Sequence, residues 1–323
     1  MQSTESTLSD RALKWVVDAI HPEAEVLSAE RLFGGVSSPV HGISLRVDGE
    51  VRHFVLRQID NKEWLQEQPD LVVREAESLR RAAEAAGVRI PAVVAFDETG
   101  SRCGTGMPAL LMTRLEGKVV LEPEDRFAWL NGMAQALIQI HDVKAGDFPW
   151  AFAPYCNAAS LDTSSWSKVP DQWQIAAGIV TSERPAFTAR FIHRDFHPAN
   201  VLWSGGAVSG VVDWVNGCIG PAGVDVGHCR VNLALLYDVR TADEFLTLYR
   251  QYAGDSFAYD PYWDLVTLID FAYWPPEVYG GWTALGMGGL TTEMMIERLD
   301  AYLVSLLDRV SKTKAQADQR AKG

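Results

Sequence analysis

The sequence lacks the patterns that mark several common protein classes. The 323-residue chain contains neither the G-x-x-x-x-G-K-[ST] pattern of a P-loop nor the G-x-G-x-x-G pattern of a dinucleotide-binding fold. The N-terminus has no basic segment followed by an apolar one, and no uncharged apolar run is long enough to span a bilayer. These absences predict a cytoplasmic protein that is neither secreted nor inserted into a membrane.

Cysteine is scarce, and its spacing excludes two further kinds of site. The four cysteines are far apart and form no C-x-x-C pair; they are Cys103, Cys156, Cys218 and Cys229. The sequence therefore predicts neither a zinc knuckle nor a redox motif, and we expect four reduced thiols.

Positive charge is also in short supply. The chain has 29 Lys and Arg against 42 Asp and Glu, which gives a net charge of −13. Such a chain repels nucleic acid and anionic membrane surfaces, so we expect neither as a main partner. The acidity favours a cationic small molecule, but it also serves simply to keep a protein soluble. At this length we expect two lobes, although the sequence does not predict an oligomeric state.

The most informative stretch is residues 193–213, HRDFHPANVLWSGGAVSGVVD. It places His193, Asp195 and Asn200 in an H-x-D-x-x-x-x-N pattern, and Asp213 follows a short apolar run. This is the order of a kinase catalytic loop followed by a metal-binding strand end. Phosphoryl transfer needs a carboxylate that accepts the proton of the attacking hydroxyl, and Asp195 fits that role. It also needs oxygen ligands for Mg²⁺, which Asn200 and Asp213 would provide.

The chain before this stretch has the pattern of a small antiparallel sheet with one long helix. Alternating apolar runs and turn signals predict strands at Val26–Phe33, Val40–Val47, Val51–Ile59, Val93–Phe96 and Ala109–Thr113. A helix is expected at Pro69–Ala86. Arg57 on the third strand and Glu75 on this helix would form the ion pair with which kinases hold nucleotide phosphates. Without the catalytic pattern, solvated charges would explain both residues equally well.

The remainder of the chain is predicted to be mainly helical. Further helices are expected at Leu8–Ile20, Pro123–His141, Gln172–Thr181, Asp225–Tyr237, Ala242–Tyr252, Pro261–Tyr273 and Thr292–Val310. We therefore predict an α+β protein with a nucleotide-binding lobe at 1–115, a helical lobe with the acceptor site at 116–310 and a disordered tail at 311–323.

The segments HRDFHPANVLW, GVVDW and GPAGVDVG resemble those of aminoglycoside phosphotransferases and choline-kinase-like enzymes. VLR at 55–57, REAESL at 74–79, LLMTRLEG at 110–117 and IQIH at 138–141 follow in the same order. The resemblance implies a two-lobed protein-kinase-like fold and an ATP- and Mg²⁺-dependent kinase with a small-molecule hydroxyl acceptor.

The resemblance also implies a role for individual residues. Asp195 would be the catalytic base, Asn200 and Asp213 the Mg²⁺ ligands, and Asp225 a buried brace of the catalytic loop. His193 and His197 would orient that loop by hydrogen bonds. The expected nucleotide contacts are Gly34, Gly35, Ser37 and Ser38 around the phosphates, Arg57 and Glu75 beside them, Thr113 and Leu115 at adenine, and Leu202 under the purine.

The sequence departs from the protein-kinase pattern in three places. The third-strand cation is Arg57 where many kinases have lysine, and arginine stays charged and can bind phosphate bidentately. Asp213 is followed by Trp214-Val215 and not by Phe-Gly, which matches the small-molecule branch better. Asp213 and Asp225 are too close in sequence to enclose an activation segment, so Arg194 is expected to form a local ion pair instead.

The acceptor is the least certain part of the prediction. An aminoglycoside or another antibiotic fits best, and an amino alcohol or metabolite is the alternative. The helical lobe is rich in tryptophan and contains Asp264, Asp270, Glu277 and Glu293. Aromatic rings and carboxylates bind amines, and we expect acceptor contacts from Asp270, Tyr273 and Trp274.

Other functions are less compatible with the sequence. They are a protein kinase, a catalytically weak nucleotide-binding protein, and a metal hydrolase with His193, Asp195 and His197 as zinc ligands.

Overall fold

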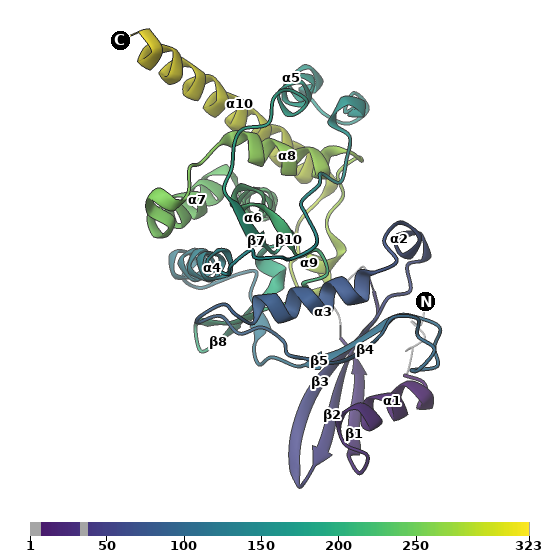
Figure 1. Ribbon diagram of the computed structural model, residues 1–323. Helices are drawn as coiled ribbons and strands as arrows, with labels where there is room; N and C mark the ends of the chain where they lie inside the picture. The colour runs from purple at the N-terminus through teal and green to yellow at the C-terminus, as the bar shows by residue number, and fades with distance from the viewer. Residues whose placement is uncertain (1–7, 33–37, 323) are drawn as a thin grey trace.

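The chain forms two lobes, seen one above the other in Figure 1. The computed structural model describes residues 8–32 and 38–322. The N-terminal lobe contains a five-stranded antiparallel sheet in the order β1-β2-β3-β5-β4. Its strands are β1 (Glu25–Arg31), β2 (Val40–Val47), β3 (Glu50–Gln58), β4 (Val93–Asp97) and β5 (Ala109–Thr113). The predicted α+β fold with an antiparallel N-terminal sheet is confirmed.

The two faces of this sheet have different partners. Helix α1 (Asp10–Ile20) begins at Ser9, whose side chain accepts a hydrogen bond from the Ala12 N–H, and it covers the face that carries Phe54 and Leu56. Because side chains alternate along a strand, Val55 and Arg57 lie on the opposite face, toward α3 and the second lobe.

The helix expected at Pro69–Ala86 is present as α3, with the shorter bounds Leu71–Ala82. A short helix α2 (Lys62–Glu67), which was not expected, precedes it. Asn61 caps α2 by accepting the Trp64 N–H, which gives this segment a start signal of its own. The consequence is that Trp64 is held at the edge of the cleft between the lobes.

The C-terminal lobe is built around the nearly fully buried helix α6 (Ala222–Leu236). Around it lie α4 (Arg126–His141), α5 (Pro170–Val180), α7 (Val239–Ala253), α8 (Pro261–Ala272), α9 (Gly280–Ala284) and α10 (Thr292–Lys322). Arg230 on α6 forms ion pairs with Asp264 on α8 and Asp243 on α7, so that a buried cation joins three helices.

Two small sheets carry the segments between these helices. One consists of β6 (Lys118–Val119), β8 (Val201–Ser204) and β9 (Ala207–Val211), and the other pairs β7 (Ala189–Ile192) with β10 (Cys218–Pro221). Single 3₁₀ turns occur at η1 (Ala158–Ser160), η2 (Pro198–Asn200) and η3 (Gly254–Ser256). The catalytic stretch begins directly after β7 and ends after β9.

The lobes share one continuous hydrophobic core, which includes residues of α3, β5 and the helices of the second lobe. The chain passes between the lobes at residues 114–117, next to the expected boundary.

The expectation of a disordered tail from Ser311 is wrong for residues 311–322, which continue α10. This segment contains no glycine or proline and is rich in lysine, alanine and glutamine, all good helix formers. Within the described residues, no helix combines the length and apolar character needed to cross a membrane.

Candidate active site

The catalytic loop is anchored by a buried carboxylate on α6. Asp225 accepts hydrogen bonds from the backbone N–H groups of His193, at 2.7 Å, and Arg194, at 2.6 Å. The His141 Nε2 atom lies 3.0 Å from the same carboxylate. Burial alone would raise the pKa of Asp225, but the hydrogen bonds from His141 and the His193 backbone outweigh it, so the pKa is lowered. An ionised Asp225 therefore fixes the backbone from which Asp195 projects.

Two residues of the site have left-handed backbone. Arg194 has φ 70° and Asp213 has φ 66°, and the third non-glycine residue of this kind among those described is Asp48 in a hairpin turn. Such conformations cost about 1–3 kcal/mol and persist where surrounding contacts enforce them. For Arg194 those contacts include the expected local ion pair, with Nη2 3.2 Å from Asp270.

Asp195 is surrounded by hydrogen-bond donors. The Nε2 atom of His228 on α6 lies 3.0 Å from its Oδ1, and the Asn200 amide nitrogen lies 3.3 Å from its Oδ2. The Nε2 atom of His197 is 3.8 Å from Oδ1. Burial would raise the pKa of Asp195, but the His228 hydrogen bond and the electrostatic effect of His197 lower it below its ordinary value. The carboxylate is thus ionised at neutral pH, as a proton acceptor must be.

The two histidines of the sequence motif differ in their surroundings. His193 uses both ring nitrogens, since Nε2 lies 3.0 Å from the Val212 carbonyl oxygen and Nδ1 accepts the Asp195 N–H at 3.2 Å. Burial lowers the pKa of His197 to about 4, so this ring is neutral at pH 7. Because both ring nitrogens of His193 are used, this residue is not free to bind zinc. Asp195, His197 and His228, in contrast, have potential ligand atoms within 4.8 Å of one another.

A buried ion-pair cluster lies across the cleft from Asp195. The Arg57 Nη1 atom is 3.0 Å from Glu75 and 2.6 Å from Asp213, and Arg57 Nε donates to the Ser38 hydroxyl at 2.7 Å. Burial raises the pKa of Glu75 to about 7 against the lowering effect of Arg57. This cluster unites β3, α3 and the end of the catalytic stretch.

The donor set beside this cluster suits a hard divalent cation. The Asn200 side-chain nitrogen donates to the Asp195 carbonyl oxygen at 2.9 Å, which leaves its amide oxygen available. Asn200 and Asp213 line the same cavity between the lobes. Carboxylate and amide oxygens are ligands that Mg²⁺ accepts, and the residues present fit such an ion.

This interlobe cavity has a volume of about 370 Å³. Most of the residues expected to contact a nucleotide line it, namely Ser38, Arg57, Glu75, Thr113, Leu115 and Leu202, and so do the expected metal ligands Asn200 and Asp213. The N–H group of Thr113 is already used by the Ala92 carbonyl oxygen, which leaves the backbone around Leu115 for a ligand. Gly34, Gly35 and Ser37 lie outside the described residues.

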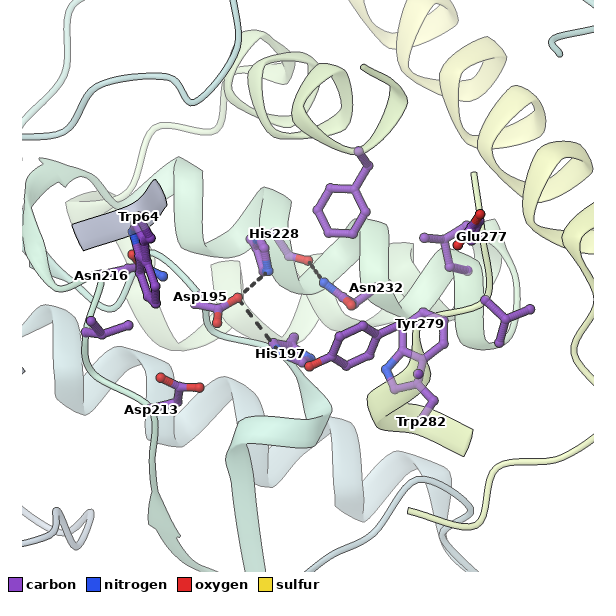
Figure 2. Close-up of a pocket in the computed structure, with 15 residues that line it drawn as sticks. Trp64, Asp195, His197, Asp213, Asn216, His228, Asn232, Glu277, Tyr279 and Trp282 are labelled. Carbon is purple, nitrogen blue, oxygen red and sulfur yellow. Dashed lines mark hydrogen bonds and ion pairs between the residues drawn. The ribbon is translucent and has the colours of Figure 1, made fainter. Parts of the chain in front are cut away.

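A second cavity of about 520 Å³ opens on the other side of Asp213, and we call it the C-lobe cavity. Figure 2 shows Asp195, His197 and His228 grouped on its wall, with Tyr279 and Trp282 beyond them. Asp213 and Tyr279 line both cavities, so the two spaces meet at these residues. A group held in one cavity can therefore reach a group held in the other.

The three residues expected to contact the acceptor do not line this cavity. Asp270 is paired with Arg194, the Tyr273 hydroxyl lies 3.0 Å from the Ser160 hydroxyl, and Trp274 is 74% exposed. The neighbouring Phe271 lines it instead. Adjacent helix residues point about 100° apart, so a shift of one residue changes the face.

Sequence reasoning missed several residues of the site. His228 and Asn232 follow Asp225 at helical spacings of three and seven residues, and this signal could have placed both on the face that braces the catalytic loop. Tyr279 and Trp64 come from short segments that give no comparable periodic signal.

A family model and several solved structures relate the chain to known phosphotransferases. A model of the phosphotransferase enzyme family matches residues 42–265, which is more than half of the chain. No curated protein sequence is significantly similar to it.

Several solved structures share the fold. A thermostable mutant of aminoglycoside phosphotransferase APH(4)-Ia, in a ternary complex with AMP-PNP and hygromycin B, aligns with a TM-score of 0.62 and 18% identity over 90% of this chain and 97% of that one. An aminoglycoside-3'-phosphotransferase of type VIII gives 0.55 and 17% over 82% and 100%. The amicoumacin kinase hAmiN, in complex with AMP-PNP and Ca²⁺, gives 0.54 and 13% over 91% and 93%. At such identities the likeness shows the fold.

Proposed function

This chain belongs to the phosphotransferase enzyme family, and from that premise we propose that it transfers the γ-phosphate of ATP to a hydroxyl group of a small molecule. One observation carries the proposal. The catalytic carboxylate Asp195 lines the C-lobe cavity, the oxygen ligands Asn200 and Asp213 line the interlobe cavity, and the two cavities meet at Asp213. This is the arrangement that a transfer between two bound substrates requires.

The nucleotide would bind in the interlobe cavity. Leu202 would pack under the purine, and the backbone around Thr113 and Leu115 would hydrogen-bond its edge. The phosphates would be enclosed by a loop that contains Gly34, Gly35, Ser37 and Ser38. Arg57, oriented by its ion pair with Glu75 at 3.0 Å, supplies the positive charge that positions them.

The acceptor hydroxyl would bind against the Asp195 carboxylate. Asp195 accepts the hydroxyl proton as the hydroxyl oxygen forms a bond to the γ-phosphorus, and the bond from that phosphorus to the bridging oxygen breaks to release ADP. When bound, Mg²⁺ would be held by Asn200 and Asp213 and would neutralise charge on the phosphates. Because Asp195 is ionised before the reaction, no prior deprotonation is needed.

For the acceptor we propose a broad class of compounds and no single substrate. Aminoglycosides and other antibiotics are supported by the relatives of similar fold, among them the APH(4)-Ia complex with hygromycin B and the amicoumacin kinase. Amino alcohols and metabolites are the alternative. The net charge of −13 supports excluding nucleic acid as a partner. The four free thiols support a cytoplasmic location.

The cluster of Asp195, His197 and His228 favours one rival function, a zinc-dependent hydrolase. The two functions are separated by measuring ADP release with Mg-ATP across aminoglycosides, other antibiotics and amino alcohols, together with metal analysis of the purified protein. Acceptor-dependent ADP release that disappears in Asp195→Ala supports the kinase. Tightly bound zinc with no affinity for Mg-ATP, or wild-type turnover by Asp195→Ala, would contradict it.

A further inference from the structure

The C-lobe cavity offers a single free counter-charge to an acceptor. None of the described residues that line it is a lysine or arginine, and its carboxylates are Asp195, Asp213 and Glu277. Asp213 is paired with Arg57, and Asp195 accepts a hydrogen bond from His228 and faces the reacting hydroxyl. Glu277 is exposed to solvent where it lines the cavity, and it forms no hydrogen bond or ion pair with another described residue, so it is the carboxylate that remains to bind a cation.

Much of the rest of the cavity wall is apolar. Phe271, Val278 and Tyr279 line the cavity and are partly exposed, whereas Trp282 is only 1% exposed and supports the Tyr279 ring. The Tyr279 and Trp282 rings are fixed against each other in an edge-on contact with centroids 5.7 Å apart. A rigid aromatic wall of this kind favours a flat or apolar body, because each Å² removed from water contributes about 25 cal/mol.

The remaining polar groups are few and point to specific contacts. Asn232 donates from its side-chain nitrogen to the His228 carbonyl oxygen at 2.9 Å, which leaves its amide oxygen as an acceptor. Burial, with the nearby Asp195 and Asp213 carboxylates, raises the pKa of Tyr279 to about 12, so its hydroxyl remains protonated. Beyond Glu277, these neutral groups must satisfy the acceptor.

We infer that the acceptor is an amphipathic alcohol with an aromatic or other apolar body and at most one cationic group. Its hydroxyl lies at Asp195, its body packs against Phe271 and Tyr279, and its cationic group faces Glu277. Asp195, Asn232 and Glu277, labelled in Figure 2, line the same cavity. A compound with several ammonium groups fits poorly, because each additional one would be desolvated without a carboxylate partner. The inference rests on the proposed kinase function and narrows its acceptor.

Three probes that differ in one property at a time, together with one aminoglycoside, test the inference. Phenylethanolamine has a ring, a hydroxyl and one ammonium group, phenyl glycol lacks the charge, ethanolamine lacks the ring, and hygromycin B is a larger aminoglycoside. Binding to the protein saturated with Mg-ADP is measured by ligand-observed NMR and calorimetry, and ADP release is measured with Mg-ATP. Both phenyl compounds are expected to bind more tightly than ethanolamine and hygromycin B.

Charge recognition is tested with a matched pair of variants. Glu277→Gln is expected to weaken phenylethanolamine binding about ten-fold and to leave phenyl glycol unchanged. Glu124→Gln, which removes an exposed carboxylate outside the cavity, should affect neither compound.

Three outcomes overturn the inference: hygromycin B as the tightest ligand, equal binding of ethanolamine and phenylethanolamine, or no binding of either phenyl compound. Affinity for Mg-ATP is measured on the same protein as a control. If the proposed function is wrong, Mg-ATP does not bind; if only the inference about the acceptor is wrong, Mg-ATP still binds.

Discussion

The Nε2 atom of His228 lies 3.0 Å from Oδ1 of Asp195, so a side chain from α6 supports the carboxylate that we propose as the catalytic base. Asp225, one turn earlier on the same helix, holds the backbone of that loop at the N–H groups of His193 and Arg194. One helix therefore controls both the position of the loop and the orientation of its carboxylate. The buried Arg230 pairs with Asp264 and Asp243, which ties this helix to its neighbours.

Replacing His228 should mainly affect the rate of transfer. His228→Leu removes the hydrogen bond to Asp195, and the loss of such a supporting partner typically lowers activity about 10- to 100-fold. The interlobe cavity does not include His228, so the KM for ATP should remain close to wild type. His228→Gln, which can still donate to Asp195, should recover part of kcat. Equal losses in both variants, or a large rise in the KM for ATP, would assign His228 a general structural role.

Removing the catalytic carboxylate should separate chemistry from nucleotide binding. We expect Asp195→Ala to lower kcat by a factor of about 10² to 10⁴, because the acceptor proton loses its recipient. Mg-ATP affinity, measured by calorimetry, should persist, since the nucleotide contacts lie in the other cavity. Loss of both properties together would indicate a folding defect, which circular dichroism of the variant would reveal.

Much of the fold and the catalytic loop could be predicted from sequence because both depend on short patterns. Asp195, Asn200 and Asp213 occur at fixed spacings, and the chemistry restricts which residue types can serve there. Strands β2 and β3 alternate apolar and polar residues, so their limits were predicted to within one residue or so. Such local signals do not depend on what the rest of the chain packs against.

The residues that line the C-lobe cavity, where we propose that the acceptor binds, could not be predicted in the same way. Asp270 is taken by Arg194 on the catalytic loop, and no local pattern in either segment signals that pairing. Of the carboxylates noted in the helical lobe, Asp264 is likewise paired with a buried arginine, and Glu277 remains in the cavity. Which charges are neutralised is decided by tertiary contacts, and so the choice required the structure.

Arg57 should be tested together with Glu75. Arg57→Met leaves the buried Glu75 carboxylate without a cation 3.0 Å away, and breaking a buried pair in this way costs about 3–5 kcal/mol. Adding Glu75→Gln removes the unpaired charge and should restore part of that stability, as measured by urea denaturation. The double variant should bind ATP more weakly than wild type, because the cation that positions the phosphates is missing. Purely additive losses in the double-mutant cycle would show that the two residues do not interact energetically.

The stability conferred by Asp225 should depend on pH. Its pKa is lowered in the folded protein from an ordinary value of 3.8, because the hydrogen bonds from His141 and the His193 backbone favour the ionised form despite burial. A carboxylate with a lowered folded-state pKa stabilises the fold at pH values above its unfolded pKa, and this contribution disappears as the pH falls through the folded-state value.

Asp225→Asn is accordingly expected to lower the free energy of unfolding by about 2–4 kcal/mol at pH 7, since one amide cannot accept all these hydrogen bonds. The difference from wild type should persist down to about pH 4 and shrink below it. Asp255→Asn, on an exposed residue, provides the control and should change stability by less than about 0.5 kcal/mol at any pH. Urea midpoints measured between pH 3 and pH 7 decide the matter. A deficit of the same size across the whole range would mean that Asp225 acts through packing, with no contribution from its charge.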